Sequence, residues 1–169
     1  MNLHTASIKF ACLLMGALIG SAHAEVSASS TGNPEAVAQI EQIVHTFKKS
    51  IIDKDAKTLG ALFLSENNSW LTVLDAGLYP RVKAKKPEAK KVRASTYQDF
   101  VGFVGSTKEA IEEKFSNVQV HTNGSVAAVY FDFVFVMNDK VTNRGSESWH
   151  LVKTDEGWRI SSMIYSDGD

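Results

Sequence analysis

Three short turn sequences divide the last third of the chain into four apolar, β-branched runs. Asn123-Gly124 separates EEKFSNVQVHT from SVAAVYFDFVFVM, and further turns follow at Asn138-Asp139-Lys140 and Asp155-Glu156-Gly157. Asn-Gly between apolar runs is a strong hairpin signal, because both central residues of the tight turn adopt positive φ. The stretch from about Glu113 to Ser166 is therefore predicted to form a meander of four antiparallel strands.

The second of these runs is apolar on both faces. Side chains alternate between the two faces of a strand, so one face would carry Val129, Phe131, Phe133 and Phe135, and the other Val126, Ala128, Tyr130 and Val134. Both faces then need cover, which the rest of the chain or a partner must supply.

The first 24 residues have the features of a secretory signal peptide. His4 and Lys9 precede an apolar run from Phe10 to Ile19, and an A-x-A sequence ends at Ala24. This run is too short to span a bilayer as a helix, and no second long apolar segment follows. Residues 1–24 are expected to be removed, and the mature protein is expected in the periplasm or outside the cell.

Composition limits the chemistry of the mature protein. The chain's single cysteine, Cys12, lies in the signal segment, so disulfides, a thiol nucleophile and thiolate metal sites are not expected. No metal-ligand spacing of histidines and no glycine-rich phosphate loop is seen, and neither a metal nor another cofactor is predicted. Without Lys9 the mature chain has 17 basic and 19 acidic residues, a net charge of about −2, which argues against nucleic acid as a partner.

Residues 33–169 are predicted to form a single domain after a disordered leader at 25–32. Asn33-Pro34-Glu35 is a helix start, and apolar residues at spacings of three and four continue to Ile51. Asp55 is expected to cap a second helix over 56–63. A first strand is expected over 70–74.

A third short helix is predicted from a capping box formed by Ser95 and Gln98, ending near Gly105. The segment before it, from Asp75 to Ala94, has no regular period. It holds seven basic residues and one acid between Arg81 and Arg93. We interpret this basic loop as a solvated connection, with attraction of anionic ligands or an anionic membrane surface as the alternative.

This order of elements resembles the nuclear-transport-factor-2-like superfamily, which includes ketosteroid isomerases and SnoaL-like polyketide cyclases. The resemblance covers residues 34–166 and rests on the helical hairpin ending in Ala61-Leu62-Phe63, the meander, and its close at Gly157-Trp158-Arg159-Ile160. It implies an α+β fold, a cone-shaped roll in which three N-terminal helices pack on a strongly curved, mainly antiparallel sheet. It also implies a pocket in the cone and a homodimer formed through the outer face of the sheet.

The resemblance does not carry isomerase chemistry with it. An isomerase of this type uses an aspartate base, a tyrosine and a protonated aspartic acid. The equivalent positions are Trp70 or Leu71 for the base, Phe47 for the tyrosine and His150 for the acid. Only His150 retains a group that exchanges protons near neutral pH.

Two residues are therefore candidates for catalysis. The resemblance places His150 in the pocket, although Trp149 and Leu151 are the more apolar pair and would normally face inward. Asp132 lies in the most apolar strand, where burial would raise its pKa. Alternation groups it with Tyr130 on the opposite face, which favours a solvated or dimer-interface carboxylate, with Glu147 and Arg144 as possible cross-strand partners.

Aromatic residues near the ends of the elements would suit a flat apolar ligand, although plain core packing explains most of them. They include Tyr97 and Trp149; the predicted ligand-binding set is Phe47, Trp70, Phe131, Phe133, His150 and Tyr165. The sequence thus favours an exported protein that binds a small, largely apolar ligand. An isomerase-type or SnoaL-like enzyme using His150 or Asp132, and a protein-interaction module, are the alternatives.

Overall fold

The computed structural model describes residues 30–168, which form four helices and one six-stranded sheet. The helices are α1 (Pro34–Asp53), α2 (Ala56–Ala61), α3 (Leu78–Lys85) and α4 (Tyr97–Ser106). The strands are β1 (Ser69–Leu74), β2 (Val92–Ser95), β3 (Ile111–Thr122), β4 (Val126–Met137), β5 (Lys140–Thr154) and β6 (Gly157–Asp167). The signal peptide predicted over 1–24 lies outside the described residues.

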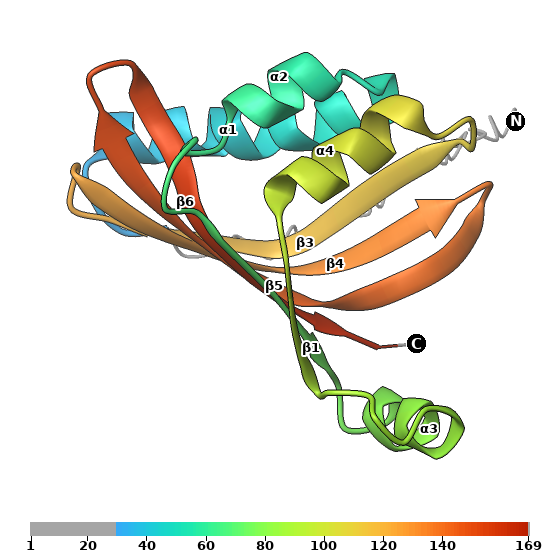
Figure 1. Ribbon diagram of the computed structural model, residues 1–169. Coiled ribbons are helices and arrows are strands. Elements are labelled where there is room, and N and C mark those ends of the chain that lie inside the picture. The colour runs from blue at the N-terminus through green and yellow to red at the C-terminus, as the bar shows by residue number, and fades with distance from the viewer. Residues whose placement is uncertain (1–29, 169) are drawn as a thin grey trace, which may run out of the picture.

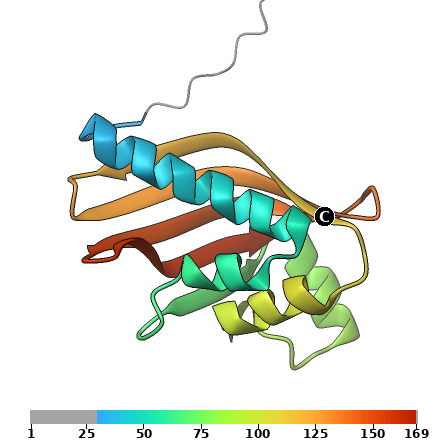
Figure 2. The ribbon, with the colours of Figure 1, turned by 90° about the horizontal axis from the view of Figure 1, so that it is seen from above.

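The sheet is mainly antiparallel and strongly curved. Its strand order is β2-β1-β6-β5-β4-β3, and only β1 and β6 run parallel. Helices α1, α2 and α4 lie together on one side of it (Figure 1). Seen from above, α1 crosses the sheet while α2 and α4 lie beside it (Figure 2). The predicted α+β roll is confirmed, with α1, α2 and α4 as its three covering helices.

The meander forms with the predicted turns. Gly124 and Gly157 adopt φ of 92° and 113°, and both Asn138 and Asp139 have positive φ at the middle turn. Strands β3 to β6 then pair in sequence order. Glycine, asparagine and aspartate tolerate this left-handed backbone better than other residues, so the turn residues account for the hairpins.

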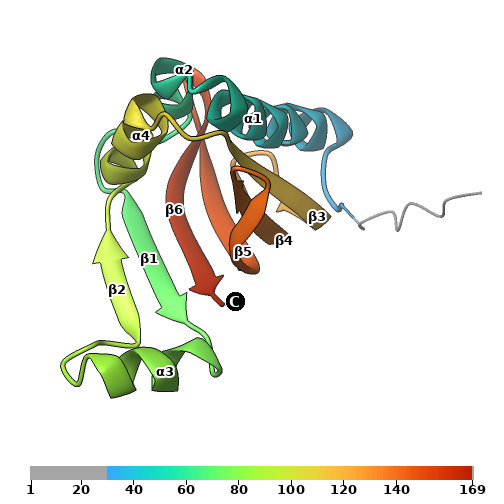
Figure 3. The same ribbon diagram turned by 90° about the vertical axis from the view of Figure 1, so that its right-hand side faces the viewer.

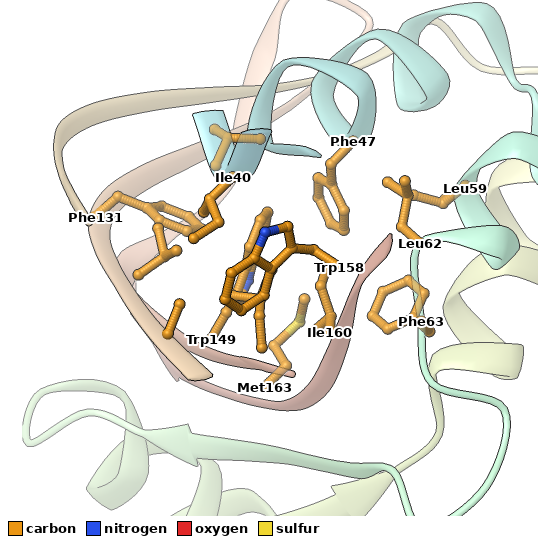
Figure 4. Packing of buried hydrophobic residues seen from close by; sticks show 14 of the residues in the cluster. Ile40, Phe47, Leu59, Leu62, Phe63, Phe131, Trp149, Trp158, Ile160 and Met163 are labelled. Carbon is orange, nitrogen blue, oxygen red and sulfur yellow. The ribbon is translucent and has the colours of Figure 1, made fainter. Parts of the chain in front are cut away.

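The main core lies between α1 and the inner face of the sheet. The Asn33 side chain caps α1 by accepting hydrogen bonds from the backbone nitrogens of Glu35 and Ala36. From this helix Phe47 reaches the sheet, with its ring centroid 4.8 Å from that of Trp149. Both side chains are fully buried (Figure 4). Burial of rings this large contributes roughly 1.5–3 kcal/mol each, so the α1–sheet contact is a major source of stability.

The segment predicted as an irregular basic loop instead contains α3 and β2. Asp75 accepts hydrogen bonds from the backbone nitrogens of Gly77 and Leu78 where α3 begins. Pro80 lies in the first turn, where a missing N–H costs no helical hydrogen bond. Strand β2 pairs with β1, and the two strands with α3 form an arm directed away from α1, α2 and α4 (Figure 3). Neither α3 nor β2 contains a buried residue. Their sequences therefore have no periodic spacing of apolar residues from which a helix or a strand could be predicted.

Several boundaries also differ from the sequence prediction. Helix α2 ends at Ala61 and not at residue 63, and β1 begins at Ser69, one residue before the expected start. Helix α4 begins with a capping box between Thr96 and Asp99, one residue after the expected pair, because Ser95 is the last residue of β2. The predicted disordered leader is wrong at its end. There Thr31 pairs with the edge of β3, donating its N–H to the Val120 carbonyl and accepting from the Thr122 N–H. Residues 25–29 lie outside the described part.

Within residues 30–168, no helix covers the outer face of the sheet (Figure 1). Four large apolar side chains remain exposed along it: Val126 (54%), Tyr130 (45%), Val141 (48%) and Ile164 (41%). The sequence predicted that the rest of the chain or a partner covers both faces of the sheet. Within the described residues, only the inner face is covered.

Candidate functional site

A small cavity of about 70 Å³ opens on the inner face of the sheet, between α1 and α4. Such a volume holds a few water molecules or a ligand group of a few non-hydrogen atoms. Six of the ten lining residues are aromatic; the full set is Phe47, Trp70, Phe100, Glu113, Phe133, Phe135, Asn143, Glu147, Met163 and Tyr165. The walls are therefore largely apolar, and the polar groups come from β3, β5 and β6.

Strand register brings these polar groups together. Glu113 on β3 and Asn143 on β5 both pair with Phe135 of β4, so they stand on either side of one phenylalanine. Further along β5, Glu147 pairs with Tyr165 of β6. Side chains directly opposite on neighbouring strands share a face, so all of them point toward the helices.

Glu147 is one of two buried carboxyl groups in the cavity, with 4% of its surface exposed. Burial raises its pKa to about 8, although the indole N–H of Trp149 donates a hydrogen bond to Oε1 and opposes the rise. A carboxyl group with this pKa changes its protonation state close to neutral pH, which is the property required of a general acid or base.

Glu113 is the second buried carboxyl, with 5% of its surface exposed. Burial raises its pKa well above the ordinary value, and the charge of nearby Glu147 raises it further. Its side chain makes no hydrogen bond to any other residue in the described part of the chain. Because two carboxylates in a dry site repel one another, the pair retains a proton at pH values where exposed glutamates are ionised.

Two further polar side chains complete the site. Asn143 Oδ1 is buried and has no hydrogen-bond donor among residues 30–168. Burial raises the pKa of the Tyr165 hydroxyl, against hydrogen bonds with Thr72 and Trp70 that lower it. None of the residues that line the cavity is basic. The site is therefore rich in oxygen acceptors and contains no positive charge of its own.

Neither a metal site nor a membrane span is found in residues 30–168. No group of three or more histidine, aspartate, glutamate or cysteine side chains there could hold a metal ion. No described helix is long and apolar enough to cross a membrane.

No family model and no curated protein matches the sequence. Solved structures do match. A proposed dehydratase of the nuclear-transport-factor-2-like family from Streptomyces avermitilis superposes with a TM-score of 0.60 at 15% identity, covering 81% of this chain and 99% of that one. A nuclear-transport-factor-2-like protein of unknown function from Pseudomonas putida KT2440 gives 0.60 at 12% identity, covering 79% and 87%.

A third match is a proposed scytalone dehydratase from Novosphingobium aromaticivorans, with a TM-score of 0.57 at 14% identity over 79% of this chain and 84% of that one. The chain has the nuclear-transport-factor-2-like fold. Identities this low establish the architecture alone, and they confirm the resemblance inferred from the sequence at that level.

The nuclear-transport-factor-2-like cone brings four of the six predicted ligand-binding residues to the cavity: Phe47, Trp70, Phe133 and Tyr165. Phe131 faces inward but belongs to the core, where its ring stacks on Phe115 with centroids 4.0 Å apart. Tyr97 and Trp149 are also packed on other rings, against Phe63 and Phe47. Whether the four lining residues bind a ligand stays a prediction.

His150 and Asp132 do not reach the cavity. His150 is exposed on the outer face, with Nδ1 3.0 Å from Ser162 Oγ, and it borders a groove of about 490 Å³ there. The pocket position that the resemblance assigned to it is wrong. Trp149 and Leu151 take the inner face, as alternation along β5 favoured.

Asp132 lies on the same outer face. Its carboxylate accepts hydrogen bonds from Asn117 Nδ2 and Ser146 Oγ, each at 2.7 Å, and these bonds lower its pKa. The suggested pairing with Glu147 or Arg144 is wrong, because the residue opposite Asp132 on β5 is Ser146. Neither catalytic candidate has the inward position that proton transfer in the cone requires.

Glu113 and Glu147 were missed as site residues, although the sequence contained a signal for them. Each takes a position in a strand whose alternate residues are apolar, as in Ile111-x-Glu113-x-Phe115 and Glu147-x-Trp149-x-Leu151. When a glutamate alternates with buried residues along a strand, either the buried face of the strand has been misassigned or the carboxyl group is itself buried. Here both are buried.

Proposed function

We propose that the chain binds a small molecule in the cavity between α1, α4 and the inner face of the sheet. The observation that carries this function is the pair of buried carboxyl groups, Glu113 and Glu147, at a cavity whose lining has no basic residue. Burying ionisable groups without a charged partner costs stability, and such groups in a cleft are typical of functional sites.

The proposal includes export and a homodimer. Export is supported by the basic start, apolar run and A-x-A sequence within residues 1–24. Dimerisation is supported by the four exposed apolar side chains on the helix-free face of the sheet, since a patch of this kind is typical of an interaction surface.

Acid–base catalysis in the same cavity is a second candidate, favoured by the pKa of about 8 at Glu147. A carboxyl group titrating there is protonated or ionised in comparable amounts near neutral pH. Tyr165 and Asn143 offer hydrogen bonds beside it. The two solved structures described as proposed dehydratases have this fold, and by analogy the reaction class would be proton transfer during elimination or isomerisation.

Native mass spectrometry of the mature protein, purified from its producing cells without denaturation, tests the binding function. We expect an added mass that is lost on denaturation, is absent from Glu147→Gln, and persists in Asp132→Asn, the matched change on the outer face. A protein free of added mass in cells and after incubation with cell extract would overturn the proposal.

The molecule released by denaturation then separates binding from catalysis. Returned to wild-type protein, it would be converted if the second candidate is correct, with a rate governed by a group titrating near pH 8 and lost in Glu147→Gln. A released molecule that stays unchanged would leave the binding function alone.

A further inference from the structure

We infer that the cavity takes a positively charged organic group, such as the ammonium head of a small amine. This inference rests on the proposed binding function and specifies the charge of its ligand. It is carried by the two acidic side chains at the cavity, the absence of a basic residue from its lining, and its aromatic walls.

Acceptors without donors are the first line of support. Glu113 is 5% exposed and makes no hydrogen bond within residues 30–168, and Asn143 Oδ1 is buried without a partner. Of the Glu147 oxygens, Oε1 accepts from Trp149. An ammonium group brings three N–H donors and no acceptor, which is the complement of this set once the carboxyl groups are ionised.

The aromatic walls are the second line of support. Phe47, Trp70, Phe100, Phe133, Phe135 and Tyr165 surround the cavity. Aromatic faces attract organic cations, most strongly where water is excluded. A neutral apolar group would satisfy these walls but leave the two carboxyl groups and Asn143 unpaired. An anion would be repelled by Glu113 and Glu147 in their ionised state.

The size of the cavity limits the size of the ligand group that can bind. About 70 Å³ accommodates a head group of a few atoms and not a ring system. Three or more metal-binding side chains do not come together anywhere in the described residues, and apolar aromatic walls supply no ligands to a bare metal ion. The geometry therefore fits methylammonium better than a hydrated divalent cation.

The carboxyl pair also sets how such binding varies with pH. The titratable groups at the cavity are Glu113 from β3, Glu147 from β5 and Tyr165 from β6. Helices α1 and α4 and strand β1 contribute only Phe47, Phe100 and Trp70. On α1, Lys48 Nζ lies over the Phe115 ring, 5.7 Å from its centroid, and does not line the cavity. A cation binds best when both carboxyl groups are ionised, so its affinity must rise as pH increases through the value at which Glu147 titrates.

Titration calorimetry and tryptophan fluorescence with methylammonium chloride test the inference, with acetamide as the neutral probe, acetate as the anionic probe and calcium chloride as the metal probe. We expect methylammonium alone to bind, with an affinity at least tenfold higher at pH 9 than at pH 6, since one titrating group can change it tenfold per pH unit. Glu147→Gln and Glu113→Gln should each weaken binding at least tenfold at pH 9, and Asp132→Asn should leave it unchanged.

Other outcomes overturn the inference and are distinguishable from failure of the binding function itself. If acetamide or acetate binds as well as methylammonium, the cavity does not select a cation, although it remains a small-molecule site. If calcium binds more tightly than methylammonium, the site is a metal site and not a site for an organic cation. If no probe binds and the native protein carries no added mass, the inference and the proposed function fail together. The probe series uses wild-type protein, so it decides the matter even where a glutamine variant does not fold.

Discussion

The two faces of the β3–β6 meander have the same backbone and opposite chemistry. On the inner face, Trp149 and Glu147 are buried beneath α1. On the outer face, His150 follows Trp149 directly in β5, and Asp132 lies on the neighbouring strand β4. Both meet solvent and neighbouring hydroxyl or amide groups. The difference shows that the environment of a titratable residue here depends on its parity along the strand and not on how apolar its immediate neighbours are.

The pKa directions follow this division. Burial raises the pKa of Glu147 to about 8, whereas hydrogen bonds from Asn117 and Ser146 lower the pKa of Asp132. Asp132 lies in the strongly apolar strand β4, and Glu147 lies in the more polar strand β5. Only the inner one is removed from water, so only the inner one is available for proton exchange near neutral pH.

The largest effect should come from placing a charge on the inner side. Phe47→Asp puts an unpaired carboxylate against Trp149 and removes a buried ring, so we expect the free energy of unfolding to fall by more than about 3 kcal/mol. Urea denaturation followed by circular dichroism measures the change. Ile52→Asp, at a position of α1 that is 52% exposed, is the matched control and should change stability by about 0.5 kcal/mol or less. Equal effects at the two positions would show that the buried face of α1 is misassigned.

The fold was predictable to the extent that burial produced a pattern. Turn residues and alternation predicted the meander, and apolar spacing predicted α1, because these elements bury one face. Helix α3 and strand β2 bury no residue. Their sequence therefore had no period to detect, and an unpatterned basic segment was interpreted as a loop.

The site was less predictable, for a related reason. A shift of one residue along a strand moves every side chain to the opposite face, and the resemblance assigned His150 to a position that Trp149 and Leu151 exclude. Glu113 and Glu147 interrupt an apolar pattern, so propensity alone treats them as surface residues. Only the register of β3, β4 and β5 shows that both face one cavity.

The second prediction concerns the pH dependence of stability. The folded-state pKa of Glu147 is about 8 and its ordinary value is 4.5, so the folded state binds the proton more tightly than the unfolded state. Stability should therefore be highest below pH 4.5 with respect to this group and fall as pH rises toward 8. Glu113 acts in the same direction. We expect the melting temperature to fall by several degrees between pH 5 and pH 8.5.

Glu147→Gln should flatten that fall, because it removes one titrating group and the charge that raises the pKa of Glu113. Differential scanning calorimetry at matched ionic strength measures both proteins. Asp132→Asn should retain the wild-type slope between pH 5 and pH 8.5, since the Asp132 carboxyl has a lowered pKa and is ionised throughout this range. A Glu147→Gln protein with the wild-type slope would contradict the assignment of the buried pair.

A smaller effect is expected from removing the outer carboxylate. Asp132→Ala loses the hydrogen bonds from Asn117 and Ser146, and we expect it to cost about 1 kcal/mol of unfolding free energy at pH 7. The pKa of Asp132 is lowered in the folded state. The carboxylate therefore stabilises the fold at pH values above its ordinary pKa of 3.8, and this stabilisation is lost as the pH falls below 3.8. Urea titrations at pH 7 and pH 3 compare the two conditions. A larger cost at pH 3 than at pH 7 would reverse the expected sign.

The smallest change in stability, and the sharpest separation of the two faces, should come from Tyr130→Lys. Tyr130 is 45% exposed on the outer face, so a lysine there should alter the unfolding free energy of the subunit by about 0.5 kcal/mol or less. In the proposed homodimer, however, two copies would place like charges in one apolar interface, and the dimer should dissociate. Sedimentation velocity over a range of protein concentrations measures this, with Ile52→Lys in the helix layer as the matched control. A wild-type protein that sediments as a monomer, or a Tyr130→Lys dimer of unchanged affinity, would show that the outer face is not the contact between subunits. Dissociation in Tyr130→Lys and not in Ile52→Lys would assign the outer face to the contact between subunits.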